Sequence, residues 1–246
     1  MIGISKIVGL IAATMLVAVG TASAQQNLRV ALLDAEPGVI RSSNEVGGRD
    51  IDIWDAIAKD SGLRFTYVFM NVPQLLAALD EGNADVIGQG ITPTPATEAK
   101  YLLTDTLFQT AEALVVPKTD TRMYRGLDDI KSLGFATLTA SPYADYLKKN
   151  RITIIKELDT IPEVVKTVTS GEANAGLFSG TIAGYLVKQG KLSDVRVVNS
   201  YQPALSRPIV AAFPKTASEN FNRANASLKR LIADGTTARI KAKYGL

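Results

Sequence analysis

Apolar residues recur along the chain in two alternating patterns. Stretches with the helical spacing i, i+3, i+4, i+7 are followed by short continuous apolar runs, which are typical of buried strands. In the first half the helical spacing covers residues 72–79, Gly82 follows as a residue suited to end a helix, and the apolar run 84–87 comes next. The same order returns in the second half, at residues 161–168, Gly171 and 173–177. One helix-then-strand unit is therefore predicted in each half, although any α/β protein can repeat such a unit.

The remaining elements follow the same alternation. Besides the run at 84–87, strands are predicted at residues 28–33, 64–70, 111–116, 135–138, 153–155, 175–178, 195–198 and 209–213, and the run at 175–178 is the one already described in the second half. Besides the stretch at 72–79, helices are predicted at residues 50–59, 142–149, 162–170, 181–189, 218–233 and 236–243, and the helix at 162–170 is the one already described in the second half. Strands that alternate with helices of this length indicate βαβ units and mostly parallel sheets. The predicted fold class is α/β, and ligands of such sheets bind beyond the carboxyl ends of the strands.

The first two dozen residues are typical of a targeting segment. Lys6 is the only charged residue before the apolar run 7–19, and residues 22–24 (Ala-Ser-Ala) give the small-x-small pattern that a signal peptidase cleaves. A membrane-spanning helix needs roughly 20 apolar residues, more than this run holds. We therefore expect a signal peptide over residues 1–24 and a periplasmic mature protein.

Composition narrows the chemistry that is available to the chain. There is no cysteine and no histidine, which excludes disulfides, thiolate nucleophiles, cysteine zinc sites and histidine as a ligand or base. The 27 basic and 24 acidic residues nearly balance and are scattered, so nothing favours a nucleic-acid or membrane-surface partner. We expect no metal and no cofactor.

The loops that follow the predicted strands hold the candidate ligand-binding residues. These loops are rich in hydroxyl groups and glycines, and each opens a helix whose free N-terminal amides can donate to a small ligand. Ser, Thr and Pro at such places are also ordinary helix caps, so only their convergence on one edge favours a site. On this basis we expect the ligand to be bound by Asp34, Glu36, Gln89, Gly90, Thr92, Thr97, Thr139, Ser141 and Ser179.

Several short motifs together resemble the bacterial extracellular solute-binding proteins of family 3, which deliver ligands to ABC importers. Residues 48–53 (G-R-D-I-D-I) are similar to the family's G-F-D-V-D-L, and residues 90–95 (G-I-T-P-T-P) to its G-M-T-I-T-P. Further segments match the family at residues 79–87, 104–105, 146–147, 171–175 and 234–236. The resemblance extends from Leu28 to Tyr244.

The resemblance implies the two-lobed type II periplasmic binding fold, with closure of the lobes around a ligand. Lobe 1 would comprise residues 25–114 and 206–246, and lobe 2 residues 115–205. Two hinge strands are expected near 113–116 and 204–206. The implied partner is an ABC permease, and we expect a monomer.

Two departures from the family bear on the ligand. The arginine that binds the ligand α-carboxylate in amino-acid binders corresponds to Thr97, and the acidic residue that binds the α-ammonium corresponds to Ser179. Each charge-assisted hydrogen bond contributes roughly 1.5–3 kcal/mol, so without both an amino acid should bind far more weakly. We expect a small polar ligand other than a standard α-amino acid. Arg41, Arg49 or Arg207 could supply a displaced guanidinium, although arginines are mostly solvent-exposed.

Three functions are compatible with this sequence. The first is solute binding for an ABC importer, and in that case Asp34 and Glu36 could hold a cation or a polyol. The second is an accessory or sensory partner of a periplasmic quinoprotein-type dehydrogenase, since fold does not fix function. The third is a lyase similar to cyclohexadienyl dehydratase, which would need an acid or base such as Glu36, Asp34 or Lys118. We favour the first, a binding protein that is not an enzyme.

Overall fold

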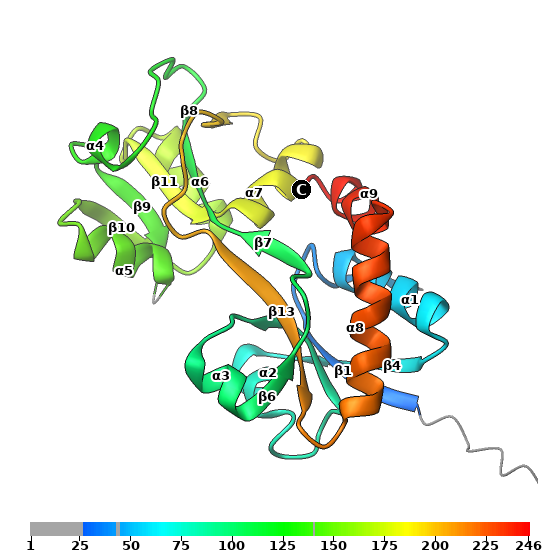
Figure 1. Ribbon diagram of the computed structural model, residues 1–246. Coiled ribbons are helices and arrows are strands. Elements are labelled where there is room, and N and C mark those ends of the chain that lie inside the picture. The colour runs from blue at the N-terminus through cyan, green and yellow to red at the C-terminus, as the bar shows by residue number, and fades with distance from the viewer. Residues whose placement is uncertain (1–26, 43–44, 140) are drawn as a thin grey trace, which may run out of the picture.

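The computed structural model describes residues 27–42, 45–139 and 141–246, which form two α/β lobes (Figure 1). Each lobe is built on its own β-sheet, with helices packed against the sheet. The predicted signal peptide, residues 1–24, lies outside the described residues. None of the helices within the described ranges is long and apolar enough to cross a membrane.

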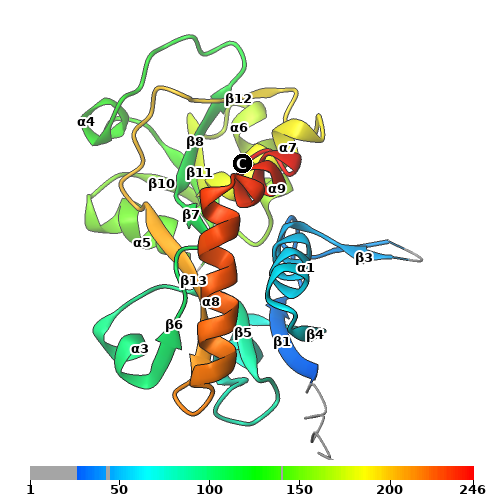
Figure 2. The same cartoon turned by 45° about the vertical axis from the view of Figure 1, so that its right-hand side comes forward.

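Lobe 1 is organised around a six-stranded sheet with the order β4-β1-β5-β13-β6, and β7 pairs with β13 beside this path. The strands of this sheet are β1 (Asn27–Leu33), β4 (Arg64–Met70), β5 (Val86–Ile91), β6 (Tyr101–Leu103), β7 (Phe108–Thr110) and β13 (Arg207–Pro214). The helices of lobe 1 are α1 (Arg49–Ser61), α2 (Val72–Ala77), α3 (Pro95–Lys100), α8 (Ser218–Ala233) and α9 (Thr236–Lys243). A hairpin of β2 (Ile40–Arg41) and β3 (Val46–Gly47) projects from this lobe (Figure 2).

Lobe 2 is organised around a five-stranded sheet with the order β10-β9-β11-β8-β12. Its strands are β8 (Glu112–Pro117), β9 (Phe135–Leu138), β10 (Ile154–Leu158), β11 (Ala175–Ser179) and β12 (Val195–Val197). Its helices are α4 (Leu127–Ile130), α5 (Pro142–Lys149), α6 (Ile161–Thr169) and α7 (Gly180–Lys188).

Helix α1 is fixed against the lobe 1 sheet by its buried face. Ile53, Trp54 and Ile57 are almost fully buried, and the Trp54 indole N–H donates to the Gly88 carbonyl oxygen at 2.9 Å. The helix ends at Gly62, whose φ of 69° lies in the left-handed region that glycine adopts without strain. Because α1 is held along its length, the orientation of its first turn is fixed as well.

Over residues 27–42, 45–139 and 141–246 the chain passes between the two sheets twice. β7 of lobe 1 ends at Thr110 and β8 of lobe 2 begins at Glu112, so the first passage occurs at Ala111. The chain returns between β12 and β13. The lobe boundaries remain a proposal, and the strand pairing favours a first boundary at Ala111 rather than after Leu114, because Glu112 already pairs with Ser179.

Most predicted elements are present, with some at the predicted bounds, but the sheets are more mixed than expected. The helix at 218–233 and the strands at 64–70 and 135–138 are found as predicted. Strands connected through helices are parallel, as in the β1–β4 and β9–β10 pairs. β8 and β13, which follow the passages between the lobes, run antiparallel to their neighbours. The expectation of mostly parallel sheets therefore holds only for the helix-connected strands.

Candidate functional site

A cavity of about 250 Å³ lies between the two lobes. Lobe 1 contributes the loop after β1, the first turn of α1, the end of β5 and the β7–β13 pair, while lobe 2 contributes the starts of α5 and α7. The residues that line it are Leu33, Ala35, Glu36, Pro37, Gly38, Arg49, Asp50, Gln89, Gly90, Phe108, Thr110, Tyr143, Ser179, Thr181, Ile182, Arg207 and Ile209. Its volume is below the range of roughly 300–1,000 Å³ that is usual for drug-sized ligands, which favours a small ligand.

The β7–β13 pair presents four side chains on one face of the cavity. Phe108 lies opposite Ile209 and Thr110 lies opposite Arg207 in the antiparallel register. Directly opposed residues of such a pair project to the same side, and alternate residues of one strand share a face. All four residues line the cavity. The face therefore combines an apolar half, at Phe108 and Ile209, with a polar half at Thr110 and Arg207.

Arg49 and Asp50 form a buried ion pair beside this face. Both residues belong to the first turn of α1 and are only 3% and 2% exposed. Arg49 Nε donates to Asp50 Oδ1 at 2.7 Å, and the Arg49 guanidinium carbon lies 3.6 Å from the centre of the Phe108 ring. The guanidinium is thus held by an ion pair and by a cation–π contact.

Several buried polar atoms at and around this ion pair make no hydrogen bond. Within the described part of the chain, four buried side-chain polar atoms lack a hydrogen-bond partner: Arg49 Nη1, Asp50 Oδ2, Arg207 Nε and Asp105 Oδ2. The first three belong to residues that line the cavity. Buried polar groups are nearly always paired, and an unpaired one costs about 1–3 kcal/mol. Their concentration at one cavity makes it a candidate ligand site.

The start of α7 brings further donors to the cavity from lobe 2. Ser179 is the N-cap residue, and its side chain makes no capping hydrogen bond. The Gly180 amide donates to the Ala111 carbonyl oxygen, whereas Thr181 and Ile182 line the cavity. The N-terminus of this helix carries a partial positive charge and favours an anionic group.

Burial, modified by nearby polar and charged groups, raises the pKa of two tyrosines near the cavity. Burial raises the pKa of the Tyr143 phenol, which lines the cavity, while Ser179 and Arg207 act in the opposite direction. Burial also raises the pKa of Tyr185 on α7, and the nearby Glu36 carboxylate of lobe 1 adds to that rise. Glu36 and Tyr185 therefore face each other from different lobes, and both phenols stay neutral around pH 7.

Comparison with known proteins agrees with this architecture. Residues 28–246 match the model of the bacterial extracellular solute-binding proteins, family 3. This chain belongs to that family. PatH of Vibrio harveyi, which carries the name of an amino-acid ABC transporter-binding protein, is 27% identical over 85% of this chain and 84% of its own length. The arginine-binding extracellular protein ArtP of Bacillus subtilis is 21% identical over 86% and 82% of the two chains.

Solved structures of amino-acid solute-binding proteins share the fold. The ancestral cationic amino acid solute-binding protein AncCDT-1 superimposes with a TM-score of 0.76 at 25% identity, covering 89% of this chain and 96% of its own. Substrate-binding domain 2 of Lactococcus lactis GlnP gives a TM-score of 0.76 at 21% identity, covering 92% and 98%. The predicted two-lobed type II fold is thus confirmed.

Four of the nine predicted ligand-binding residues line the cavity, namely Glu36, Gln89, Gly90 and Ser179. They come from both lobes, so the structure brings together loops that are far apart in the chain. Gly90 has a φ of 91°, a backbone conformation that side-chain-bearing residues rarely adopt. Their role in binding is a prediction that a ligand complex would test.

The other five predicted residues lie outside this cavity, and most of them have structural partners. Thr97 forms a capping box with Thr94 at α3 and donates to the Thr92 carbonyl oxygen at 3.2 Å. Ser141 caps α5 and donates to the Leu138 carbonyl oxygen at 2.6 Å. Asp34 is paired with Arg41 at 2.9 Å, and Thr139 is exposed.

Sequence reasoning was wrong about Arg49. An exposed arginine was the expectation, but Arg49 is buried at the cavity, whereas Arg41 is exposed and paired with Asp34. The signal lay in the motif itself, because Arg49 stands where the family pattern G-F-D-V-D-L has phenylalanine. Asp50, the next residue of that motif, was not considered as a site residue.

The described residues offer little support for other sites. No three acidic residues among them gather closely enough to hold a metal ion. A larger hollow of about 420 Å³ lies in lobe 2 between residues 117–122 and 171–174. Its charged groups are already paired, since Arg122 and Tyr124 both donate to Asp120 and Arg196 donates to the Asp120 carbonyl oxygen. The cavity between the lobes is therefore the candidate functional site.

Proposed function

We propose that this protein captures a small polar ligand between its lobes in the periplasm and delivers it to an ABC importer. The observation that carries the proposal is the concentration of unpaired buried polar atoms of Arg49, Asp50 and Arg207 at the cavity between the lobes. A ligand that pairs with these atoms gains hydrogen bonds to buried, partly charged groups, which contribute more than bonds to neutral exposed ones. Membership of the solute-binding family supports the delivery step.

Capture would proceed by closure of the lobes. The cavity wall is divided between them, with Glu36 and Gln89 on one side and Ser179 and Thr181 on the other. Within the described part of the chain two passages connect the sheets, so rotation about them can close the site over a ligand. Closure excludes water and strengthens each hydrogen bond to the ligand. This cycle needs no group that exchanges protons with the ligand or attacks it.

We expect the ligand to differ from a standard α-amino acid bound in the family's usual way. Thr97 replaces the carboxylate-binding arginine, and its hydroxyl group is engaged in the capping box of α3. Ser179 replaces the acidic residue and carries no charge with which to bind an ammonium group.

Thermal unfolding in the presence of candidate ligands tests capture. Amino acids, opines, polyols, organic acids and polyamines would each be titrated against the purified protein. A true ligand should raise the melting temperature progressively, with about 2.7 kcal/mol of stabilisation at 100 times its Kd. If no compound stabilises the protein while a periplasmic enzyme co-purifies with it, the accessory-partner function replaces the transport function.

A double substitution tests the map of the site. Thr97→Arg with Ser179→Asp restores both charged groups of the amino-acid binders, and we expect a gain in amino-acid affinity over the wild type. Each single substitution serves as a control, since one ionic group alone should give a smaller gain. No gain from the double variant would place amino-acid recognition elsewhere.

An enzymatic function is the second candidate, because a solved structure of AncCDT-1 is described as that of a precursor of cyclohexadienyl dehydratase. Of the three candidate acid or base residues, Glu36 lines the cavity, while Asp34 and Lys118 do not. Turnover of prephenate or arogenate that disappears in Glu36→Gln would establish this function. We expect no turnover.

A further inference from the structure

We infer that the ligand is a small carboxylic acid and that Arg49 is the residue that binds its carboxylate, with Arg207 as a second donor. The inference rests on the proposed capture function and names its ligand class. It places the guanidinium in the first turn of α1, whereas the family pattern has its carboxylate-binding arginine at the position of Thr97.

The Arg49 guanidinium is buried without being fully paired. The Arg49 side chain is 4% exposed, and its Nη1 has no hydrogen-bond partner. Arginine is seldom buried unless it is fully paired. Asp50 balances the charge through Nε but leaves Nη1 unused. A carboxylate supplies the missing acceptor, and its planar pair of oxygens matches the fork of a guanidinium.

The Arg49 side chain is already ordered by its neighbours. The ion pair to Asp50 and the Phe108 ring under the guanidinium fix the side chain on two sides. Asp50 packs closely on Gly38, because a β-carbon at Gly38 would collide with its Oδ2, and its amide donates to the Gly38 carbonyl oxygen at 3.0 Å. A side chain that is already ordered loses little conformational entropy when a ligand binds.

Arg207 supplies a second guanidinium on the β7–β13 face of the cavity. Arg207 lies opposite Thr110, two residues along β7 from Phe108, and its Nε is also buried without a partner. Two residues along a strand span roughly 6.5–7 Å. Arg207 and Phe108, the ring that contacts the Arg49 guanidinium, therefore lie at neighbouring positions of one cavity face, which is why we assign Arg207 as the second donor.

Among the described residues that line the cavity, none on the lobe 2 side is a charged partner for an ammonium group. That side carries Tyr143, Ser179, Thr181 and Ile182, with the α7 N-terminus among them. A helix N-terminus disfavours a cation and favours an anion. The acidic groups on the lobe 1 side are Asp50, whose Oδ1 is paired with Arg49 and whose Oδ2 makes no hydrogen bond, and Glu36, which lies near Tyr185. Recognition of the carboxylate therefore does not depend on an α-ammonium group.

The experiment compares acids with their neutral amides. The probes are L-lactate and succinate, with lactamide and succinamide as uncharged counterparts of nearly the same shape, and L-alanine as the zwitterion. Binding to the purified protein is followed by thermal shift and by isothermal titration calorimetry. We expect at least one acid to bind, its amide to bind at least about 10-fold more weakly, and L-alanine to bind no better than L-lactate.

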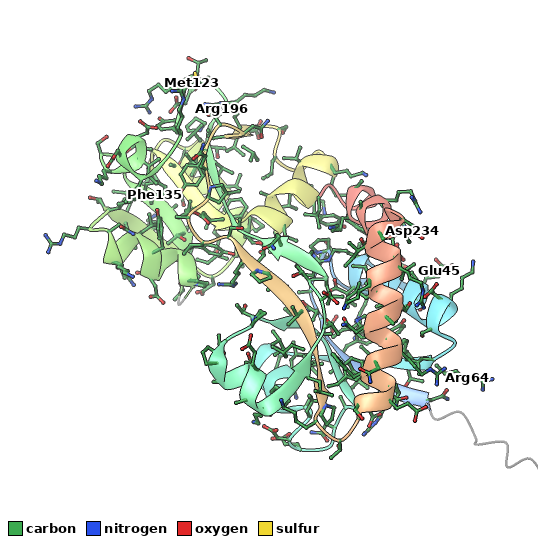
Figure 3. All side chains as sticks on the ribbon, in the orientation of Figure 1. Glu45, Arg64, Met123, Phe135, Arg196 and Asp234 are labelled. Atoms are coloured by element: carbon green, nitrogen blue, oxygen red, sulfur yellow. The ribbon has the colours of Figure 1, made fainter. Side chains whose placement is uncertain are left out.

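Variants assign the carboxylate contact. Arg49→Gln should weaken binding of the acid about 10- to 100-fold and reduce the preference for acid over amide. Arg49→Lys retains the charge but lacks the fork, and should bind with intermediate affinity. Arg64→Gln is the matched control, because Arg64 is exposed at the start of β4 and points away from lobe 2 (Figure 3). If Arg49→Gln fails to fold with Asp50 left unpaired, Arg49→Gln with Asp50→Asn supplies a neutral pair for the same measurement.

The outcomes separate this inference from the proposed function. A folded Arg49→Gln protein that binds the acid as tightly as the wild type overturns the role of Arg49. Amides that bind as tightly as acids, or a ligand from the broader panel that lacks a carboxylate, overturn the ligand class and leave capture intact. If nothing in either panel binds, the proposed function itself fails.

Discussion

Replacing Glu112 by glutamine should weaken the junction between the lobes. Glu112 opens β8 directly after the first passage and is 2% exposed. Its Oε1 accepts from the Tyr201 hydroxyl at 3.1 Å and from the Ala204 amide at 2.6 Å, and its Oε2 accepts from the Leu205 amide at 2.9 Å. One carboxylate therefore ties the returning chain to the first passage. Each of these bonds has a charged acceptor and contributes roughly 1.5–3 kcal/mol.

The size of the stability loss follows from the number of hydrogen bonds that a glutamine side chain can accept. A glutamine at this position presents one oxygen and one NH₂ group, so at least one backbone N–H of Ala204 or Leu205 faces a donor and stays unpaired. Relief from burying a charge offsets part of this loss. We expect the free energy of unfolding to fall by about 2–3 kcal/mol.

Urea denaturation followed by tryptophan fluorescence and circular dichroism provides the measurement. Trp54 is the single tryptophan and reports on lobe 1, whereas circular dichroism reports on both lobes. Glu45→Gln, at the exposed β2–β3 hairpin, is the matched control and should change stability by less than about 0.5 kcal/mol. A Glu112→Gln protein within about 0.5 kcal/mol of the wild type would refute the reasoning.

Two further predictions concern other parts of the chain. Gly184→Ala on α7 would place a β-carbon against the Gly245 carbonyl oxygen near the C-terminus of lobe 1, and overpacking there should lower the free energy of unfolding by about 1–3 kcal/mol. Gly47→Ala, which meets no atom within 4 Å, should have little effect in the same urea titration. Hydrogen bonding by Arg122 lowers the pKa of Asp120 to about 2, so this carboxylate stabilises the fold above about pH 4 and loses that contribution as the pH falls toward 2. Asp120→Asn should flatten the stability profile in that window, and an unchanged profile would contradict the pairing.

Sequence reasoning succeeded where the apolar period was long or the flanking signals were strong. The stripe of Phe221, Ala224, Leu228 and Leu231 predicted α8 with its observed bounds, because a single buried face fixes a helix of that length. Short elements without such a stripe were missed. Helix α3, for example, has no buried residue, and only Thr94 and the proline that follows it mark its start.

Sheet direction and the site depend on tertiary contacts that a one-dimensional pattern does not contain. β8 and β13 have the apolar composition of buried strands whichever way they run, and their antiparallel pairing follows from the passage of the chain between the lobes. In the same way, Thr97 and Ser141 have the composition of binding loops, but the structure uses their hydroxyl groups to cap α3 and α5. A hydroxyl at a helix start satisfies backbone donors first, and it is available to a ligand only where, as at Ser179, it does not cap.

Arg49 and Asp50 could have been recognised by extending the buried stripe of α1 toward its start. Residues four apart share a helix face, so Ile53 and Trp54 place Arg49 and Asp50 on the same side of the helix one turn earlier. Two opposite charges that continue an apolar stripe are accommodated as a buried pair, and the unused donor of this pair lies at the cavity between the lobes. The lack of cysteine and histidine suits such a site, because capture and release need fixed charges rather than a group that titrates near neutral pH. The proposed carboxylate contact thus rests on two departures from the pattern that the sequence resembles: residue 97 is threonine rather than arginine, and residue 49 is arginine rather than phenylalanine.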